Sequence, residues 1–257
     1  MNYIGIDIGS TCAKTAVLNE KKEIIQEFVQ PTGWSSVDTA EEILQKLKLA
    51  GISLSDDSSC CVATGYGRIS VPYADKAVTE ITCHALGAVH LFQQSDLTVI
   101  DIGGQDTKII QIEQGFVKDF IMNDKCAAGT GRFLEVMANT LSLRPNEMFE
   151  LARLGSDTTI SSMCTVFAES EVIGLIGKGE PKENIAYAVV DSTIRKVAAQ
   201  VSRMNGEMST FCLTGGLCEC EYIREALSKK LGKEVISSPD ARYAGAIGAA
   251  LSAMKIR

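Results

Sequence analysis

The sequence lacks any apolar run of the roughly 18–20 residues that a membrane-spanning helix needs. It also lacks a stripe of basic residues, and its 25 Lys and Arg against 32 Asp and Glu give a formal net charge of -7. This balance argues against nucleic acid as a main partner. The basic, apolar and small-residue succession of a secretory signal is missing as well. Together these absences predict a cytoplasmic protein that binds neither nucleic acid nor a membrane.

No linker rich in Pro, Ser or Gly divides the chain, although 257 residues are enough for one large domain or two modest ones. Strand patterns followed by helix patterns occur twice, which predicts an α/β architecture with helices covering mixed sheets. We place the boundary near residues 94–96. The first domain then comprises residues 1–95 and 240–257, the second comprises residues 96–239, and the two should pack around a cleft.

The spacing of apolar residues locates the individual elements. Strands are predicted at 2–8, 14–18, 23–29, 60–64, 97–102, 107–112, 115–121, 209–214 and 233–236. Helices are predicted at 38–50, 78–93, 131–141, 145–153, 165–178, 183–204, 219–231 and 241–254. Asp38 is expected to cap the helix at 38–50. The helix at 241–254 is dominated by small residues and should pack tightly against a neighbour.

One pattern occurs twice, at residues 4–17 and 98–111. In each copy an apolar strand runs into Asp, Ile, Gly and a small residue, and apolar residues then resume. A Lys follows the Asp after seven positions, as Asp7 and Lys14 in the first copy and Asp101 and Lys108 in the second. The pattern predicts a strand, a tight glycine turn and a returning strand, and its repetition suggests a duplicated domain.

Such a turn suits phosphate chemistry. Glycine has no Cβ, so the backbone of Gly9, Gly103 and Gly104 can approach a ligand closely. Consecutive N–H groups at the turn form a concavity for anions. An Asp at the strand end can hold a hydrated Mg²⁺, which usually takes only one or two carboxylates. Two such hairpins facing each other would bind the phosphates of a nucleotide from both sides.

A third glycine site follows later in the chain. The strand at 211–214 leads into Gly215 and Gly216, and a helix follows at 219–231. This arrangement suits a flat ligand such as adenine lying against the backbone. A close crossing of helix and strand explains it equally well.

Cysteine is abundant in this sequence. The chain contains nine cysteines, an odd number, and is too large to need disulfide staples. Free cysteine behaves as a small buried hydrophobe, which fits the five cysteines in or beside apolar stretches: Cys12, Cys60, Cys61, Cys83 and Cys212. For the C-x-C pair Cys218 and Cys220, a metal role and a structural role both stay open. Cys126 and Cys164 differ, because each comes just before a predicted helix.

The three glycine sites in this order resemble those of the actin, Hsp70 and sugar-kinase superfamily. This resemblance covers nearly the whole chain. It implies two ribonuclease H-like domains, with ATP and Mg²⁺ in the cleft between them.

A narrower resemblance comes from the middle of the chain. Residues 123–135 and 162–172 resemble the two signatures of the activators of 2-hydroxyacyl-CoA dehydratases, which are relatives of the ATP-binding subunits of benzoyl-CoA reductase. Residues 63–68 and 79–85 are also similar to that family. The resemblance implies that Cys126 and Cys164 hold half of a [4Fe–4S] cluster, shared across the two-fold axis of a homodimer.

The residues agree with this implication. A [4Fe–4S] cluster needs four thiolates, and a two-fold dimer presents the same pair of cysteines twice. The positive end of a helix dipole would stabilise a thiolate and an anionic cluster. Arg132 could offset cluster charge. The alternative is two buried cysteines that happen to lie near helix starts.

The resemblance implies a set of roles for individual residues. Asp7 and Asp101 should hold Mg²⁺, and the phosphates should be lined by Gly9, Ser10, Thr11, Gly103 and Gly104. Gln105 could position the attacking water or be a plain surface residue. Gly215 and Gly216 should face the adenosine. Lys14 and Lys108 either reach phosphate or point to solvent. His84 and His90 lie six residues apart, off the i, i+4 spacing of a helical metal pair, and are expected to be structural.

The function that this resemblance implies is an ATP-driven electron-transfer activator. A low-potential donor of the ferredoxin or flavodoxin type would supply the electron. ATP binding and hydrolysis, with release of ADP, would change the angle between the domains. The electron would then pass to an iron–sulfur dehydratase or reductase.

Two other functions stay open. A small-molecule kinase of the same superfamily, for example one for an amino sugar, would need an Asp as base, for which Asp101 or Asp106 could be nominated. That reading leaves Cys126 and Cys164 unexplained. A nucleotide-sensing scaffold that turns over little ATP is the second alternative.

Overall fold

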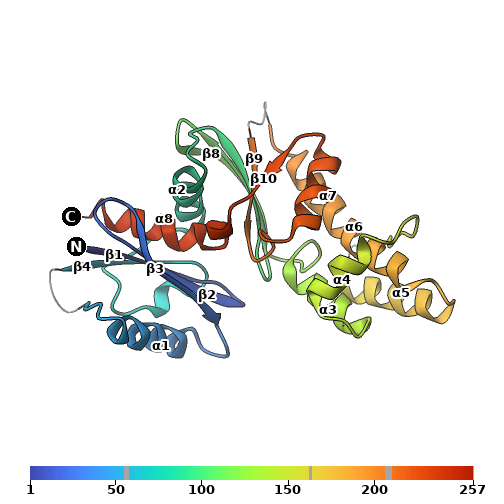
Figure 1. Ribbon diagram of the computed structural model, residues 1–257, viewed down its shortest axis with the longest axis horizontal. Helices are drawn as coiled ribbons and strands as arrows, with labels where there is room; N and C mark the ends of the chain where they lie inside the picture. Colours follow the sequence, from blue (N-terminus) through green and yellow to red (C-terminus); the bar gives the residue numbers. More distant parts are fainter. Residues whose placement is uncertain (55–57, 162–163, 206–209, 257) are drawn as a thin grey trace. The chain divides into compact units, whose positions relative to one another are not determined.

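The computed structural model describes residues 1–54, 58–161, 164–205 and 210–256 (Figure 1). The chain divides into two compact units. The first comprises Met1–Leu97, Ile110–Lys118 and Asp240–Arg257, and the second comprises Thr98–Ile109 and Asp119–Pro239. Two five-stranded sheets alternate with helices along the chain, so the predicted α/β class is confirmed.

The first sheet has the strand order β3-β2-β1-β4-β5. Its strands are β1 Asn2–Ile8, β2 Cys12–Leu18, β3 Ile24–Pro31, β4 Ser59–Thr64 and β5 Lys76–Ala77. β1 pairs antiparallel with β2 and parallel with β4, so the sheet is mixed as expected. The helical segments of this unit are α1 Ser36–Leu49, η1 Arg68–Ser70, α2 Glu80–Phe92 and α8 Ala244–Ala253, with the short η2 Pro239–Tyr243 before α8.

Helices cover both faces of the first sheet. α1 lies on one face and α2 and α8 lie on the other (Figure 1). The side of β1 that carries Ile4, Ile6 and Ile8 packs against α1 through Ile43 and Leu47. Because helices cover both sides, β4, the inner strand beside β1, is buried along its whole length. This burial holds the end of β1, with Asp7, in a fixed position.

α8 packs backbone to backbone against its neighbours, which confirms the expectation for a helix of small residues. A Cβ placed on Gly5 of β1 would lie 1.8 Å from the Ala246 carbonyl oxygen. A Cβ on Gly248 of α8 would lie 1.7 Å from the Cys83 carbonyl oxygen of α2. These distances leave no room for a methyl group, so α8 is locked onto β1 and α2 only while these positions are glycine.

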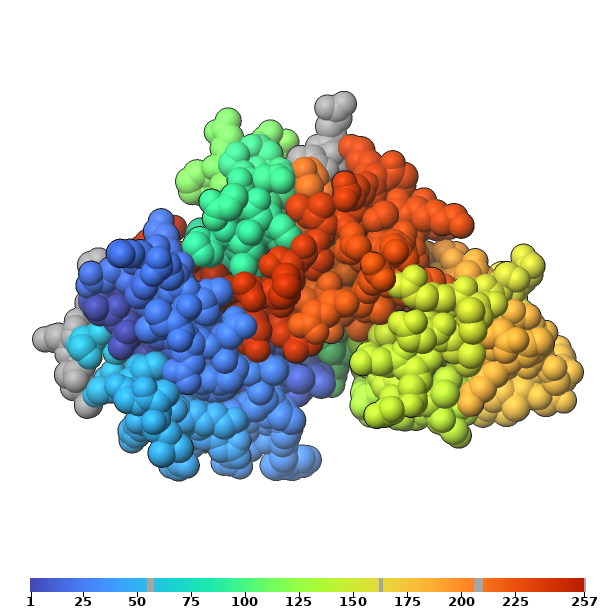
Figure 2. Space-filling model, in the orientation of Figure 1, coloured from blue at the N-terminus to red at the C-terminus, as the bar shows by residue number. Residues whose placement is uncertain are grey.

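The second sheet has the strand order β10-β9-β6-β7-β8. Its strands are β6 Leu97–Ile102, β7 Thr107–Glu113, β8 Phe116–Asn123, β9 Thr210–Gly215 and β10 Val235–Ile236. The helices of the second unit are α3 Gly131–Thr140, α4 Pro145–Ala152, α5 Thr165–Gly177, α6 Lys182–Val201 and α7 Glu221–Leu231. α6 packs against α3, α4, α5 and α7, and α3 to α5 form a contiguous part of the surface (Figure 2).

The structure corrects some details of the predicted elements. α1 begins at Ser36 and is capped by Ser35, whose Oγ accepts the Asp38 N–H at 3.2 Å, so the predicted cap at Asp38 is wrong. β5 and the short helices η1 and η2 carry no periodic signal, and the sequence did not predict them. Position 209 of the predicted strand lies outside the described residues. Among the helices that are described, none has both the length and the apolarity to cross a bilayer.

The contact at Gly248 leads to a prediction about stability. Gly248→Ala should lower the free energy of unfolding by about 1–3 kcal/mol or more, because the added methyl group overlaps a backbone carbonyl that cannot move alone. Gly174→Ala in α5 is the matched control, since nothing lies within 4 Å of its Cβ position. The control should be neutral or stabilising by up to about 1 kcal/mol. Urea unfolding measures both, and equal stability of the two variants would contradict the packing described here.

Candidate functional site

The first repeated segment forms a tight hairpin between β1 and β2. The Gly9 N–H donates to the Cys12 carbonyl oxygen at 3.1 Å, which closes the turn. Thr32, just beyond β3, holds the turn from the side: its Oγ1 donates to the Gly9 carbonyl at 2.7 Å and its N–H to the Thr11 carbonyl at 2.9 Å. Ser10 and Thr11 are exposed at the tip. The turn therefore presents backbone and hydroxyl groups to solvent, as a phosphate-binding hairpin requires.

The second repeated segment forms the same turn between β6 and β7. The Gly103 N–H donates to the Asp106 carbonyl oxygen at 2.9 Å. A Cβ on Gly103 would lie 2.2 Å from Asp106 Oδ1, so a side chain here would have to displace the Asp106 carboxylate that pairs with Lys108. Gly104 is half-buried and Gln105 is exposed. The repeat in the sequence is thus a repeat in the backbone.

Asp7 stands at the end of β1 between two glycines. The residue is 3% exposed. A Cβ on Gly65, which has a φ of +84°, would lie 2.4 Å from Asp7 Oδ1, and a Cβ on Gly245 of α8 would lie 2.4 Å from Asp7 Oδ2. The carboxylate fills a cradle that exists only because both neighbours lack a side chain.

Asp101 occupies the equivalent place at the end of β6 and is 2% exposed. A Cβ on Gly215, with a φ of +85°, would lie 2.8 Å from Asp101 Oδ1. The same oxygen accepts the Thr214 hydroxyl at 2.8 Å. The missing side chain of Gly215 therefore faces the Asp101 carboxylate of β6 and not a helix, so this close packing differs from the helix–strand crossing that was the alternative explanation. Gly216 is exposed.

These glycines reveal a second internal repeat that the sequence reading missed. Thr64 ends β4 and Gly65 follows it, Thr214-Gly215 ends β9, and each glycine packs over an Asp. The Gly67 N–H donates to the Ile8 carbonyl at 2.8 Å and the Gly216 N–H donates to the Ile102 carbonyl at 3.2 Å. A Thr-Gly pair at the end of a strand was the only signal, and two residues are too few to be noticed.

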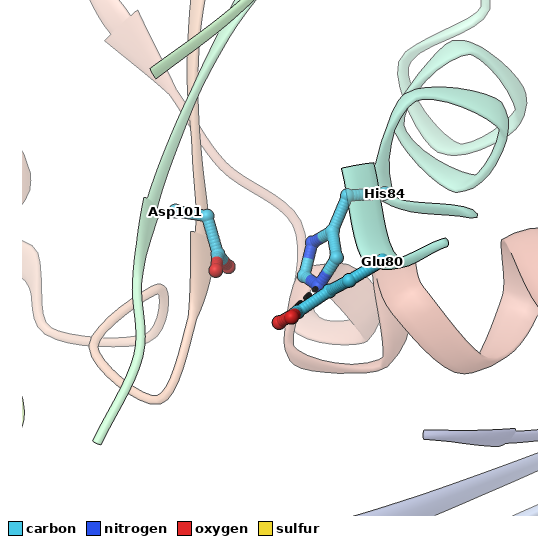
Figure 3. A group of neighbouring side chains, drawn as sticks. All are labelled: Glu80, His84 and Asp101. Atoms are coloured by element: carbon cyan, nitrogen blue, oxygen red, sulfur yellow. Dashed lines mark ion pairs between the residues drawn. The ribbon is translucent and has the colours of Figure 1, made fainter. Parts of the chain in front are cut away.

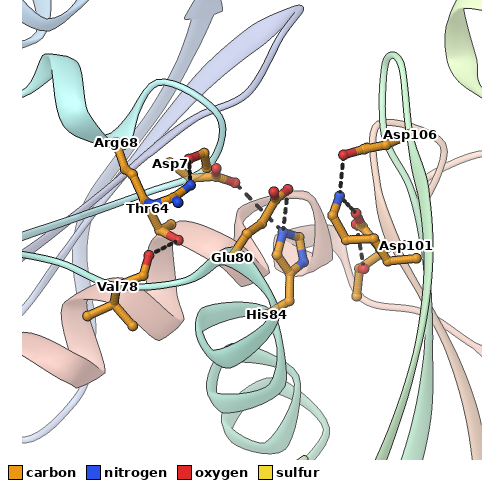
Figure 4. Close-up of polar contacts among 11 residues, drawn as sticks. Asp7, Thr64, Arg68, Val78, Glu80, His84, Asp101 and Asp106 are labelled. Atoms are coloured by element: carbon orange, nitrogen blue, oxygen red, sulfur yellow. Dashed lines mark hydrogen bonds and ion pairs between the residues drawn. The ribbon is translucent and has the colours of Figure 1, made fainter. Parts of the chain in front are cut away.

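Lys108 and Lys14 differ although they are equivalent in sequence. The Lys108 side chain is 1% exposed, and its Nζ lies 3.2 Å from Asp101 Oδ2 and 2.9 Å from Asp106 Oδ2 (Figure 4). The expectation that it could point to solvent is wrong. Lys14 is half-buried. A buried ammonium group between two carboxylates satisfies the rule that buried charges are paired.

A buried histidine lies beside Asp7. His84 of α2 is 4% exposed, and its Nε2 is 3.9 Å from Asp7 Oδ2 and 3.9 Å from Glu80 Oε1. Figure 4 shows the imidazole directed at both carboxylates. The sequence reading tested only the spacing between His84 and His90. The signal that it overlooked is the i, i+4 spacing of Glu80 and His84 on one helix.

Cys126 lies in the loop between β8 and α3 and is half-buried. Asn123 Nδ2 donates to the carbonyl oxygens of Cys126 at 2.8 Å and Ala128 at 3.3 Å, which orders the loop. Gly129 has a φ of +84°, a conformation that favours glycine. Cys126 comes five residues before the start of α3 at Gly131, so it does not cap that helix.

The loop that carries Cys126 is hydrogen-bonded to the second hairpin turn. The Gly131 N–H donates to the Gly103 carbonyl at 2.9 Å, and the Arg132 N–H donates to the Gly104 carbonyl at 2.8 Å. Thr107 Oγ1 donates to the Gly129 carbonyl at 2.7 Å. The predicted phosphate turn and the predicted cluster loop are therefore one hydrogen-bonded structure within the second unit.

Cys164 is exposed and caps the N-terminus of α5. Ser162 and Met163 of the same motif lie outside the described residues. Arg132 is exposed and pairs with Glu135, with 2.8 Å between Nη1 and Oε2, so its charge already has a local partner.

The other cysteines mostly behave as expected. Cys60, Cys61, Cys83 and Cys212 are buried, whereas Cys12 is half-buried, so for Cys12 the expectation of full burial is wrong. Burial raises the pKa of the Cys83 thiol to about 11 and raises the pKa values of Cys61 and Cys212 as well. Cys218 is buried, and Cys220 is half-buried at the N-cap of α7.

The structure has two hairpins with an Asp-Ile-Gly turn, one in each of the two five-stranded sheets. This arrangement defines a protein with the actin-like ATPase fold. A ROK family glucokinase from Streptomyces griseus, solved with glucose and AMPPNP, superposes with a TM-score of 0.61 at 18% identity and covers 99% of this chain and 100% of that one. At such low identity the likeness concerns the fold alone.

The chain belongs to the BadF/BadG/BcrA/BcrD ATPase family, whose model matches residues 4–253. It is 43% identical to the (R)-2-hydroxyglutaryl-CoA dehydratase activating ATPase of Acidaminococcus fermentans, over 98% of this chain and 96% of that protein. The crystal structure of A. fermentans (R)-2-hydroxyglutaryl-CoA dehydratase component A superposes with a TM-score of 0.92 at 42% identity, covering 100% and 98% of the two chains. The activator of the 2-hydroxyisocaproyl-CoA dehydratase from Clostridium difficile, with bound ADPNP, gives 0.90 at 34% identity and covers 100% and 95%.

The pairing of Lys108 leads to a prediction. Lys108→Met should lower the free energy of unfolding by about 3–5 kcal/mol, because it leaves the buried carboxylate of Asp101 without its ammonium partner. Lys14→Met, at the equivalent position of the first hairpin, should cost much less because Lys14 is only half-buried. The midpoint of urea unfolding reports both changes. The double variant Asp101→Asn with Lys108→Met should recover part of the loss, and equal effects of the two single variants would refute the assignment.

Proposed function

We propose that this protein is an ATP-dependent electron-transfer activator that serves a 2-hydroxyacyl-CoA dehydratase or a related iron–sulfur enzyme. The observation that carries the proposal is the set of hydrogen bonds between the Gly103–Gly104 turn and the loop of Cys126. The family and the 43% identical dehydratase activating ATPase support it. Its place of action would be the cytoplasm, and its electron donor a ferredoxin or a flavodoxin.

ATP and ADP would bind through the two hairpins. The phosphates would contact Gly9, Ser10, Thr11, Lys14, Gly103 and Gly104, and the adenosine would lie against Gly215 and Gly216. Asp7 and Asp101 fit a Mg²⁺ site, because each is a buried carboxylate whose direction is fixed by neighbouring glycines. A bound Mg²⁺ would neutralise charge that develops on the phosphates. Gln105, exposed in the second turn, is the candidate for positioning the attacking water.

Cys126 and Cys164 would hold a [4Fe–4S] cluster together with the same residues of a second copy. Cys164 is exposed and Cys126 is half-buried, which suits residues that would share a ligand between subunits. α5, which begins after Cys164, exposes the apolar side chains of Val166, Phe167 and Ile173. Such an exposed apolar face is typical of a surface that another protein covers. A bound cluster would supply one-electron chemistry at low potential.

The hydrogen bonds in the second unit supply the coupling. A nucleotide can change the state of the protein only if it binds one conformation better than another. A shift of the Gly103–Gly104 backbone on phosphate binding has to move residues 129–132 or break their hydrogen bonds. We infer that this segment transmits the state of the nucleotide to Cys126.

A kinase function has less support. The candidate bases Asp101 and Asp106 both pair with Lys108, so neither stands out as the base that a kinase needs. The likeness to sugar kinases is confined to the fold. A scaffold that turns over little ATP would not need the hydrogen bonds between the phosphate turn and the Cys126 loop, so they do not favour that function.

Iron and sulfide analysis after anaerobic purification tests the cluster. We expect about four irons and four sulfides per dimer, and loss of both in Cys126→Ser and in Cys164→Ser. Cys220→Ser is the matched control, because Cys220 also stands at a helix N-cap, that of α7, and it should retain the iron. Iron retained in Cys126→Ser and Cys164→Ser would end the cluster assignment.

Thr107→Val tests the coupling. The change removes the hydroxyl that donates to Gly129, with little change in side-chain volume, and should cost about 1 kcal/mol of stability. In the parent, ATP should alter the rate at which a chelator removes iron, and the variant should bind ATP but lose most of that effect. Thr98→Val in β6 is the control, because it makes the same change at a buried hydroxyl that has no hydrogen-bond partner among the described residues. An unchanged ATP effect in Thr107→Val would contradict the proposed route.

A further inference from the structure

The surroundings of Asp7 contain a buried group that the proposed mechanism does not use. His84 and Glu80 lie one turn apart on α2, so their side chains share one face of the helix. Figure 3 shows the two side chains meeting, with the imidazole Nε2 beside the Glu80 carboxylate. The same Nε2 lies equally far, at 3.9 Å, from Asp7 Oδ2. One nitrogen atom therefore faces two carboxylates.

The distances define what this nitrogen can do. A separation of 3.9 Å is too long for a direct hydrogen bond and suits a water molecule or a small rearrangement. Ionised carboxylates only accept hydrogen bonds, so the donor to each of them would be an Nε2 hydrogen or a water molecule bound to Nε2. An imidazole that faces a carboxylate at the end of a fixed strand can hold that carboxylate in one orientation.

The backbone around this group is built to keep it in place. A Cβ on Gly245, at the start of α8, would lie 2.4 Å from Asp7 Oδ2 and 2.9 Å from His84 Nε2. The glycine therefore makes room for the carboxylate and the imidazole together. On the other side, Arg68 Nη1 donates to the Gly65 carbonyl at 3.0 Å, and Figure 4 places Arg68 beside Asp7. Neither α8 nor β1 can move here without displacing the pair.

We propose that His84, oriented by Glu80, is a positioning residue for Asp7 and sets the orientation in which that carboxylate meets the divalent cation of the nucleotide. This inference rests on the proposed nucleotide-binding function. Groups that orient a metal-binding side chain commonly change metal affinity or activity by about 10–100-fold when they are removed. A purely structural His84 would instead affect folding and leave the dependence on Mg²⁺ unchanged.

The first experiment measures ADP affinity by calorimetry across a Mg²⁺ titration. In the parent, Mg²⁺ should tighten ADP binding. In His84→Gln and Glu80→Gln the Mg²⁺ concentration for half-maximal tightening should rise about 10–100-fold, whereas ADP affinity without Mg²⁺ and the melting temperature should stay near the parent values. His90→Gln is the matched control, because it makes the same change on the same helix at a half-buried position.

A second measurement uses the parent protein and so does not depend on the folding of a variant. The chain has only two histidines, so selective isotope labelling gives two imidazole signals in an NMR spectrum, and His90→Gln assigns them. Adding Mg²⁺ to the ADP-bound protein should shift the His84 signal and leave the His90 signal in place.

The outcomes separate the two levels of the proposal. If the parent binds neither ADP nor ATP, the proposed function fails. If the parent binds Mg²⁺ and ADP together but His84→Gln has the same Mg²⁺ dependence, or the His84 signal does not respond to Mg²⁺, the positioning role is overturned and the proposed function stands.

Discussion

A buried carboxylate at the end of a central strand, packed against a glycine of positive φ, is the constraint on which both candidate nucleotide hairpins depend. Asp7 meets Gly65 and Asp101 meets Gly215, with φ values of +84° and +85°. A side chain at either glycine would need both a strained backbone and the volume that the carboxylate already fills. The direction of each carboxylate is therefore decided by backbone geometry, and the chemistry of the turn beyond it can rely on that direction.

The two copies of this arrangement have acquired different neighbours. Asp101 is held by the Thr214 hydroxyl and the Lys108 ammonium group. Asp7 faces the imidazole of His84, which also faces Glu80. The two hairpins thus share a backbone shape, whereas the groups that surround each carboxylate differ. In the second copy, the carbonyl oxygens of Gly103 and Gly104 also accept hydrogen bonds from the end of the Cys126 loop. These bonds connect the predicted phosphate turn to the loop that carries a predicted cluster ligand.

Local patterns in the sequence were enough for much of this fold. The apolar runs of β1 and β6 and the Asp-Ile-Gly turns after them follow from short-range sterics, and the observed turns at Gly9 and Gly103 have the predicted form. The prediction of the α1 cap at Asp38 failed because Ser35 and Asp38 are both good capping residues, and the first turn of the helix decides between them. The Thr-Gly repeat could not be predicted, because each glycine packs against an Asp of a neighbouring strand that is distant in the sequence.

The sequence by itself determined where strands turn, where helices are built from small residues, and that Cys164 stands directly before a helix, because these properties depend on residues a few positions apart. Only the tertiary structure decided that Lys108 is buried while Lys14 is half-exposed, and that His84 faces Asp7. The partners of Lys108, Asp101 and Asp106, are close to it in sequence, but Asp101 in turn accepts a hydrogen bond from Thr214, which is 113 residues away. His84 and Asp7 also come from distant parts of the chain, and no local pattern encodes such contacts.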